Sequence, residues 1–295
     1  MNYILSAVLV LGLIALLAAV LLYAVSKKFA VKTDPRVGEV TSLLPGANCG
    51  GCGFAGCANM AEALVKGADN GTIEGLRCPV GGDAVMAQVA QHLGMEATKS
   101  EPMVAVVRCN GTCEHRPRIV EYDGLQTCAA VNASGRGETA CGYGCLGCGD
   151  CTRACQFDAI HMNPETGLPE VDEDKCTACG ACAKACPRHI IELRKKGPRG
   201  MRIYVQCVNK DKGAVARKGC EVACIGCGKC QRTCQFDAIT IENNLSYIDY
   251  NKCRLCTKCV SECPTGAIIQ VGGRKIAKKA AVVEEEVAER KEAQA

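Results

Sequence analysis

One spacing of cysteines, C-x2-C-x2-C-x3-C, occurs four times between residues 145 and 263 and constrains this chain more than any other feature. The leading copy starts at Cys145 and returns at Cys224, 79 residues later, and the pentapeptide QFDAI follows both. A further copy comes after each, starting at Cys176 and at Cys253. The chain therefore contains two tandem modules with two cysteine motifs apiece.

Four thiolates at this spacing are typical of cubane iron–sulfur clusters. In the bacterial ferredoxin pattern, the fourth cysteine of each motif binds the neighbouring cluster. This crossed pattern predicts four sets of [4Fe–4S] ligands: Cys145, Cys148, Cys151 and Cys186; Cys176, Cys179, Cys182 and Cys155; Cys224, Cys227, Cys230 and Cys263; and Cys253, Cys256, Cys259 and Cys234. Zinc and disulfides are the alternatives, but structural zinc sites use C-x2-C pairs that a longer loop separates.

Short apolar stretches between the motifs, such as Ile190-Ile191 and Ala267–Ile269, predict short strands. The modules resemble the two-cluster bacterial ferredoxins, which implies a small α+β fold for each. We expect the first ferredoxin-like module, with its extra cysteines, to cover residues 103–195 and the second to cover residues 203–272.

An earlier motif has the spacing C-x2-C-x4-C-x20-C and comprises Cys49, Cys52, Cys57 and Cys78. Three clustered thiols and one remote thiol again suit a [4Fe–4S] cluster, with a zinc site as the alternative. The glycines between the first three cysteines let the backbone wrap closely and direct N–H groups at the sulfurs. We therefore expect a small Fe–S domain over residues 45–95, and five clusters in the chain.

Six cysteines remain outside these motifs: Cys109, Cys113, Cys128, Cys141, Cys207 and Cys220. Cys128 and Cys141 lie 79 residues before Cys207 and Cys220, so these two pairs follow the repeat. One hypothesis groups Cys109, Cys113, Cys128 and Cys141 around a sixth cluster. Another joins the two repeat-related pairs around a cluster between the modules, and a third treats all six as buried free thiols.

The N-terminus carries an uncharged, apolar stretch of 22 residues, from Ile4 to Val25. A helix of this length spans about 33 Å, enough for a hydrocarbon layer of about 30 Å. No Lys or Arg precedes the stretch, whereas Lys27 and Lys28 follow it directly. The positive-inside rule therefore predicts a single-pass membrane anchor over residues 1–26 with the rest of the chain in the cytoplasm, and a cleaved signal is the alternative. A reducing cytoplasm also argues against disulfides.

The remaining segments are polar. Residues 27–44 are interpreted as a connector and residues 273–295 as a charged tail. The basic run from Arg194 to Arg202 is interpreted as a solvated linker between the modules, with docking of an acidic ferredoxin as the alternative. The net charge of +4 gives no reason to expect nucleic acid binding. We expect no catalytic site of the chain's own and no activity apart from electron relay.

The leading apolar helix, the stretch Pro45–Gly53 (PGANCGGCG) and the ferredoxin modules together resemble the B subunits of Rnf complexes over nearly the whole chain. The resemblance implies a bacterial inner-membrane complex that couples electron flow between reduced ferredoxin and NAD to translocation of sodium ions or protons. It also implies the other subunits of that complex as partners and soluble ferredoxin as the electron donor. The chain departs from the family's shorter members by its second module and six further cysteines.

These features favour a non-catalytic electron conduit. A self-contained enzyme would instead need a cluster with only three cysteines, whereas every clear motif here has four. A metal-stabilised scaffold for partner binding is the third hypothesis, and it predicts zinc in place of iron.

Overall fold

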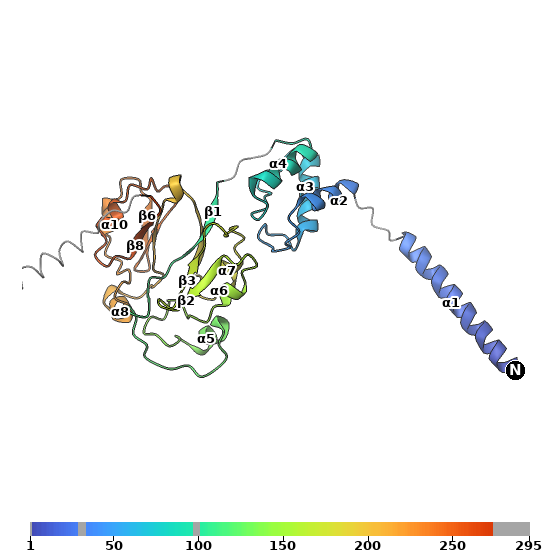
Figure 1. Ribbon diagram of the computed structural model, residues 1–295, viewed down its shortest axis with the longest axis horizontal. Coiled ribbons are helices and arrows are strands. Elements are labelled where there is room, and N and C mark those ends of the chain that lie inside the picture. Colours follow the sequence, from blue (N-terminus) through green and yellow to red (C-terminus); the bar gives the residue numbers. More distant parts are fainter. Residues whose placement is uncertain (1, 29–33, 97–100, 274–295) are drawn as a thin grey trace, which may run out of the picture.

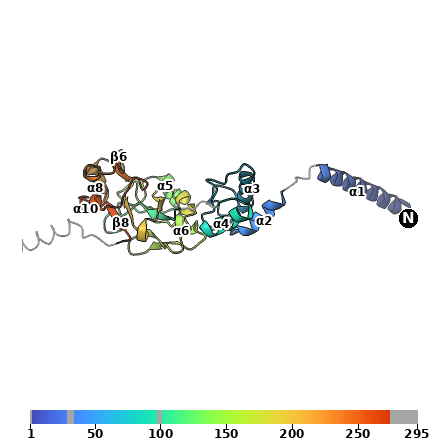
Figure 2. The ribbon, with the colours of Figure 1, turned by 90° about the horizontal axis from the view of Figure 1, so that it is seen from above.

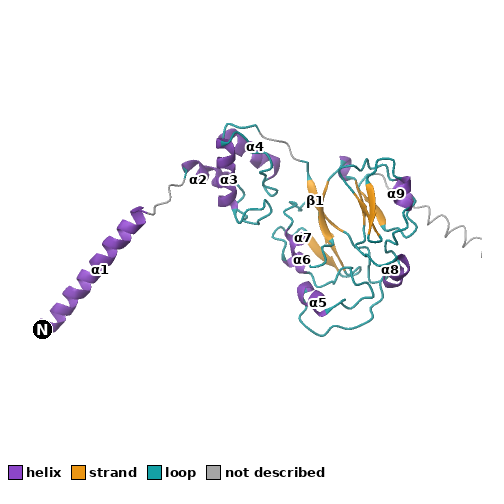
Figure 3. Ribbon diagram, turned by 180° about the vertical axis from the view of Figure 1, so that it is seen from behind, coloured by secondary structure: helices purple, strands orange, loops and turns teal. Residues whose placement is uncertain are grey.

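The computed structural model describes residues 2–28, 34–96 and 101–273, which form three parts (Figure 1). A single helix comes first, a small helical domain follows, and two α+β modules complete the described chain. Views from above and from behind show the same order along the long axis (Figures 2 and 3). The predicted fold class is confirmed by this order.

Helix α1 (Asn2–Lys28) contains the apolar stretch. Its segment Ser6–Lys28 is long and apolar enough to cross a membrane, and none of it is buried against the rest of the protein. A helix that is apolar all round needs an apolar environment, which a bilayer supplies. Lys27 and Lys28 lie in the last turn, where positive charge suits the helix dipole.

The helical domain consists of α2 (Pro35–Leu43), α3 (Cys57–Asp69) and α4 (Gly82–His92). Leu64 of α3 and Val89 of α4 are fully buried in its core. Cys57 starts α3 and Cys78 lies in the loop before α4, so the core contacts the third and fourth cysteines of the motif.

The connector predicted over residues 27–44 is shorter than expected. Its second half is α2, which Asp34 caps by accepting a hydrogen bond from the N–H of Arg36 at 2.9 Å. Val40 and Leu44 bury their side chains in the core of the helical domain. This segment therefore belongs to the Fe–S domain.

Module 1 contains two antiparallel strand pairs: β1 (Met103–Val107) with β4 (Ile191–Lys195), and β2 (Ile160–Asn163) with β3 (Leu168–Val171). Its helices are α5 (Cys128–Ser134), α6 (Asp150–Arg153) and α7 (Ala181–Ala185). Helices α6 and α7 each start inside a cysteine motif, after a glycine with positive φ.

Module 2 repeats this plan: β5 (Arg202–Val205) pairs with β8 (Ile268–Val271), and β6 (Ile239–Glu242) pairs with β7 (Leu245–Ile248). Its helices are α8 (Gly213–Gly219), α9 (Lys229–Thr233) and α10 (Lys258–Ser261), and a 3-10 turn η1 (Pro198–Gly200) joins the modules. In both modules the first strand pairs with the last, which brings the two cysteine motifs together.

The modules pack against each other through their first strands. Val104 and Val106 of β1 form a buried cluster with Tyr204 of β5, while Ala105 and Val107 point into the core of module 1. Strand β1 is therefore buried on both faces, and the two modules form one body.

The basic run between the modules differs from the predicted solvated linker. Arg194 and Arg202 are only 1% and 5% exposed. The Arg194 guanidinium lies 5.6 Å from the ring centre of Tyr204, and Arg202 is paired with Glu173. These arginines fix the interface between the modules and are not available to dock a ferredoxin.

Candidate iron–sulfur sites

Three cavities of similar size in the modules are each lined by four cysteines. The first is lined by Cys155, Cys176, Cys179 and Cys182, which we call site 1B. The crossed motif pattern groups the same four residues. The buried hydroxyl of Thr177 in this loop has no hydrogen-bond partner among the described residues, and a cluster sulfur would provide one.

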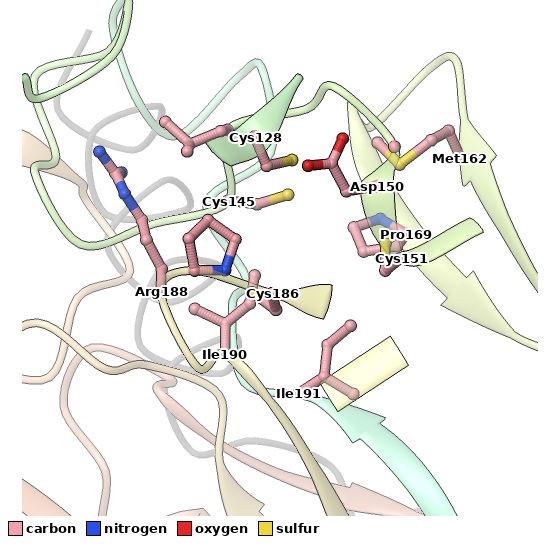
Figure 4. Close-up of a pocket in the computed structure, with 13 residues that line it drawn as sticks. Cys128, Cys145, Asp150, Cys151, Met162, Pro169, Cys186, Arg188, Ile190 and Ile191 are labelled. Atoms are coloured by element: carbon pink, nitrogen blue, oxygen red, sulfur yellow. The ribbon is translucent and has the colours of Figure 1, made fainter. Parts of the chain in front are cut away.

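The second cavity is lined by Cys128, Cys145, Cys151 and Cys186 (Figure 4). Cys148 belongs to this set by its motif, but it does not line the cavity. It lies beside Cys128, within hydrogen-bonding distance of that thiol. We call these five thiols site 1A. The structure thus places Cys128 in a different lining from Cys109, and it does not bring Cys128 together with Cys113.

The third cavity lies between the modules and is lined by Cys109, Cys141, Cys207 and Cys220, which we call site M. All four are buried, with exposures of 6% to 8%. Neither sequence hypothesis contains this set of four. Cys113 is exposed and lies next to Gly167, apart from site M.

The strands explain why sequence reasoning missed this grouping. Cys109 follows β1 by two residues and Cys207 follows β5 by two residues, and both strands have the same place in their modules. The structural repeat therefore pairs Cys109 with Cys207 and Cys141 with Cys220. The 79-residue offset pairs Cys128 with Cys207 because module 1 has a longer segment before Cys141 than module 2 has before Cys220.

Matching backbone contacts connect site M to each module. The N–H of Cys145 donates to Cys109 Sγ at 3.5 Å, and the N–H of Cys224 donates to the Cys207 sulfur. Asn209 donates its own N–H to Cys207 Sγ at 3.4 Å and its Nδ2 to Cys141 Sγ at 3.7 Å. Such N–H···S bonds stabilise added negative charge and raise the reduction potential of a bound cluster.

Buried positive charge also surrounds site M. Arg116 is 7% exposed and donates to the Cys145 carbonyl, while its Nε has no partner in the part of the chain that the structure describes. Arg108 donates to the Cys207 carbonyl at 3.3 Å and lies 3.3 Å from a Glu192 carboxylate oxygen. A buried guanidinium with an unused N–H beside four thiols fits a negatively charged ligand.

In module 2, Cys230 lies near Cys224 and Cys263, which with Cys227 form site 2A. Cys259 lies near Cys253, Cys256 and Cys234, which we call site 2B. Both groupings follow the crossed pattern. Cys227 and Cys256 are exposed, whereas their module 1 counterparts, Cys148 and Cys179, are partly covered.

The helical domain holds a further site, site N, which comprises Cys49, Cys52, Cys57 and Cys78. Cys78 is buried near Cys52 and Cys57, and its sulfur accepts a hydrogen bond from the N–H of Gly81 at 3.4 Å. The loop closes where Asn48 Oδ1 accepts a hydrogen bond from the N–H of Cys57 at 2.8 Å. Gly50 and Gly53 have positive φ, which the tight wrap of this loop requires.

Burial keeps four of these thiols protonated in the metal-free chain. The pKa is raised to about 12, mainly by removal of the side chain from water, at Cys145, Cys182, Cys207 and Cys259. Metal ligands must be deprotonated, so loading of these sites releases protons. None of the 26 cysteines, all of which lie within the described residues, forms a disulfide.

The described thiols do not form a site for a single metal ion. Sulfurs that share a tetrahedral zinc ion lie about 3.8 Å apart, because each Zn–S bond is about 2.3 Å long. Across residues 2–28, 34–96 and 101–273, no group of three or more His, Cys, Asp or Glu side chains is arranged to hold one metal ion. Four thiols that line one cavity can instead bind a cubane cluster, in which each of four iron atoms takes one thiolate.

The sites also adjoin one another in a single order. The loop of site N meets that of site 1B, because a Cβ built on Gly51 would lie 2.8 Å from the carbonyl oxygen of Cys179, and Lys184 Nζ donates to the Gly50 carbonyl at 3.3 Å. Within the modules, Cys182 lies near Cys151. In the same way Cys259 lies near Cys230.

Comparison with protein families identifies iron–sulfur domains in the same three parts of the chain. Residues 144–190 and 223–267 each match the 4Fe-4S dicluster domain family, and residues 44–72 match an Fe-S cluster family. These matches cover the two cysteine motifs of each module and the first three cysteines of site N.

Several curated proteins are similar over most of their length. The B subunit of the Na(+)-translocating ferredoxin:NAD(+) oxidoreductase complex of Acetobacterium woodii is 46% identical, over 91% of this chain and 78% of that protein. The proton-translocating counterpart of Clostridium ljungdahlii is 43% identical, over 91% and 93%. The corresponding protein of the ion-translocating oxidoreductase complex of Methanosarcina acetivorans is 41% identical, over 90% and 98%. The chain therefore belongs to the B-subunit family of ion-translocating, Rnf-type oxidoreductase complexes.

Proposed function

We propose that this chain is the electron-transfer subunit of a membrane-bound, ion-translocating ferredoxin:NAD oxidoreductase. It accepts electrons from reduced ferredoxin and relays them through six [4Fe–4S] clusters to partner subunits in the membrane. The names of its relatives support membership in such a complex, and the family matches support the binding of [4Fe–4S] clusters. The relatives differ in their coupling ion, and the proposal does not choose between sodium ions and protons.

The order of neighbouring sites is the observation that carries the proposal. From the anchor side it is site N, site 1B, site 1A, site M, site 2A and site 2B. Each step rests on a contact between cysteine-bearing segments, from Gly51 against Cys179 to Cys230 near Cys259. Site M supports continuity between the modules, since Cys109 contacts the N–H of Cys145 and Cys207 contacts that of Cys224.

The ligands we propose are four cysteines at each site. When bound, the clusters supply one-electron redox chemistry at low potential. The chain holds them with thiolates, covers them with apolar side chains and directs N–H donors at the sulfurs. At site M, Asn209 and Arg116 add donors and positive charge, which favour the reduced state.

We propose site 2B as the point at which ferredoxin delivers electrons. Its module 1 counterpart, site 1B, is covered at Cys179 by the loop of site N. The equivalent residue of site 2B, Cys256, is exposed. Arg254 lies in the same loop and Lys258 begins α10; both are exposed and form no ion pair within the described residues, so they present positive charge to an acidic partner.

At the other end, α1 is proposed to cross the bacterial inner membrane once, with the folded part on the cytoplasmic side. Lys27 and Lys28 directly after the apolar stretch support this orientation. Site N follows the anchor most closely in sequence, so partner subunits in the membrane are expected to receive electrons from it.

The test is iron analysis of the full chain, purified without oxygen in detergent. Six clusters predict about 24 iron atoms per chain and reduction of the chain by reduced ferredoxin. The isolated chain is expected not to reduce NAD. About eight iron atoms, or mostly zinc, would contradict the proposed relay.

A further inference from the structure

Site 1A has one thiol more than a cluster needs. Figure 4 shows Cys128 and Cys145 on one side of the cavity, with Cys151 and Cys186 completing its lining. These four residues suffice for a cubane cluster. Cys148, the middle cysteine of the motif loop, lies beside Cys128 and outside this lining.

Cys128 is fixed in this place by several contacts. It begins α5, it is 8% exposed, and Thr127 caps the helix by accepting a hydrogen bond from the N–H of Ala130 at 3.2 Å. The N–H of Ala129 donates to Asp150 Oδ2 at 3.2 Å, and Asp150 lies between Cys148 and Cys151 in the motif loop. The same hydrogen bond therefore holds Cys128 against the cluster loop.

Module 2 offers a comparison within the same chain. Its site 2A has the same motif, but no further cysteine corresponds to Cys128, because Cys207 and Cys220 both line site M. The counterpart of Cys148 is Cys227, which is exposed, and the counterpart of Asp150 is Lys229. A fifth thiol is thus particular to site 1A.

We propose that Cys128 and Cys148 are interchangeable ligands for one iron atom of the cluster at site 1A. This inference rests on the proposed function, since it requires a cluster there. In the exchange, the bond from iron to Cys148 Sγ breaks and a bond to Cys128 Sγ forms. The proton of the Cys128 thiol passes to the Cys148 thiolate, and no iron atom changes oxidation state.

The test compares Cys128→Ala, Cys148→Ala, the double variant and Cys227→Ala in the full chain, all purified without oxygen. Iron content and the electron paramagnetic resonance signal of oxidised three-iron clusters are measured for each. We expect both single changes at site 1A to keep wild-type iron content and to give no three-iron signal. The double variant and Cys227→Ala should each lose iron and give that signal.

Two outcomes would overturn the exchange. If Cys148→Ala loses iron as Cys227→Ala does, Cys128 is not a substitute ligand. If Cys128→Ala alone loses iron, Cys128 is an obligatory ligand rather than an exchangeable one. Wild-type protein with little iron would instead contradict the proposed function itself, so the two failures are distinct.

Discussion

The contact between site N and site 1B depends on the absence of a side chain at Gly51. A Cβ at this residue would lie 2.8 Å from the carbonyl oxygen, 2.9 Å from the Cα and 3.0 Å from the Cβ of Cys179. Two of these atoms are backbone, and they belong to the loop of site 1B. Gly51→Ala is therefore expected to push the two loops apart.

The size of the effect follows from these distances. Ordinary contacts begin at 3.4 Å, so the loops must separate by roughly 0.6 Å or the contact must open. Overpacking of this kind costs about 1–3 kcal/mol. That shifts the equilibrium between closed and open contact by about 5- to 150-fold. Gly51 does not have a positive φ, so alanine adds no backbone strain of its own.

Hydrogen exchange of the cluster-loaded chain measures this shift, because exchange reports local opening. Amides of residues 50–53 and 177–180 should exchange faster in Gly51→Ala, and reduction of site N by ferredoxin should slow. Gly38→Ala is the matched control, since a Cβ there meets nothing within 4 Å. Equal exchange in Gly51→Ala, Gly38→Ala and the unaltered protein would refute the contact.

Three further predictions concern the other sites. Arg254→Glu should slow reduction by ferredoxin about tenfold or more at low salt, and much less at high salt. Lys66→Glu makes the same charge change on α3 and should have little effect; equal slowing in both variants would exclude docking at site 2B. Cys109→Ala should lower the iron content by up to one cluster and leave the spectra of site N intact, whereas an unchanged iron content would mean that site M holds no cluster. The cluster-free chain should lose stability as pH rises from about 9 towards 12. Burial raises the pKa of Cys145 and Cys182 from 9.0 to about 12 in the folded state. Between these pH values the folded chain therefore holds protons that the unfolded chain releases, and this favours unfolding. Urea unfolding at about pH 8 and about pH 11 checks this, and the cluster-loaded chain, whose thiolates are already ionised, should show no such loss.

Much of the fold could be predicted from the cysteine spacing. A loop with a cysteine at every third residue has few other uses, so the ferredoxin-like modules and the first helix were predicted correctly. The sets at sites 1B and 2B follow from the crossed pattern, because both motifs of a module lie close in sequence. Their ligand roles stay predictions until iron is measured.

The grouping at site M could not be predicted because it depends on how the modules pack. Cys109 and Cys207 are 98 residues apart, and they meet only because Val104, Val106 and Tyr204 bury β1 against β5. The offset of 79 residues matched Cys207 with Cys128 instead of Cys109. It did so because module 1 has a longer segment before Cys141 than module 2 has before Cys220. The signal that could have found it was the place of Cys109 and Cys207, each just after the first strand of its module.

The structure also indicates where the row of sites is most easily interrupted. Modules 1 and 2 share a buried cluster, the stacked guanidinium of Arg194 and the four thiols of site M, so their spacing is fixed by many contacts. The helical domain meets module 1 through a smaller contact, in which Gly51 and Lys184 take part. A perturbation of equal cost should therefore separate site N from site 1B before it separates the modules. For this reason we expect electron arrival at site N to be more sensitive to Gly51→Ala than arrival at any site within the modules.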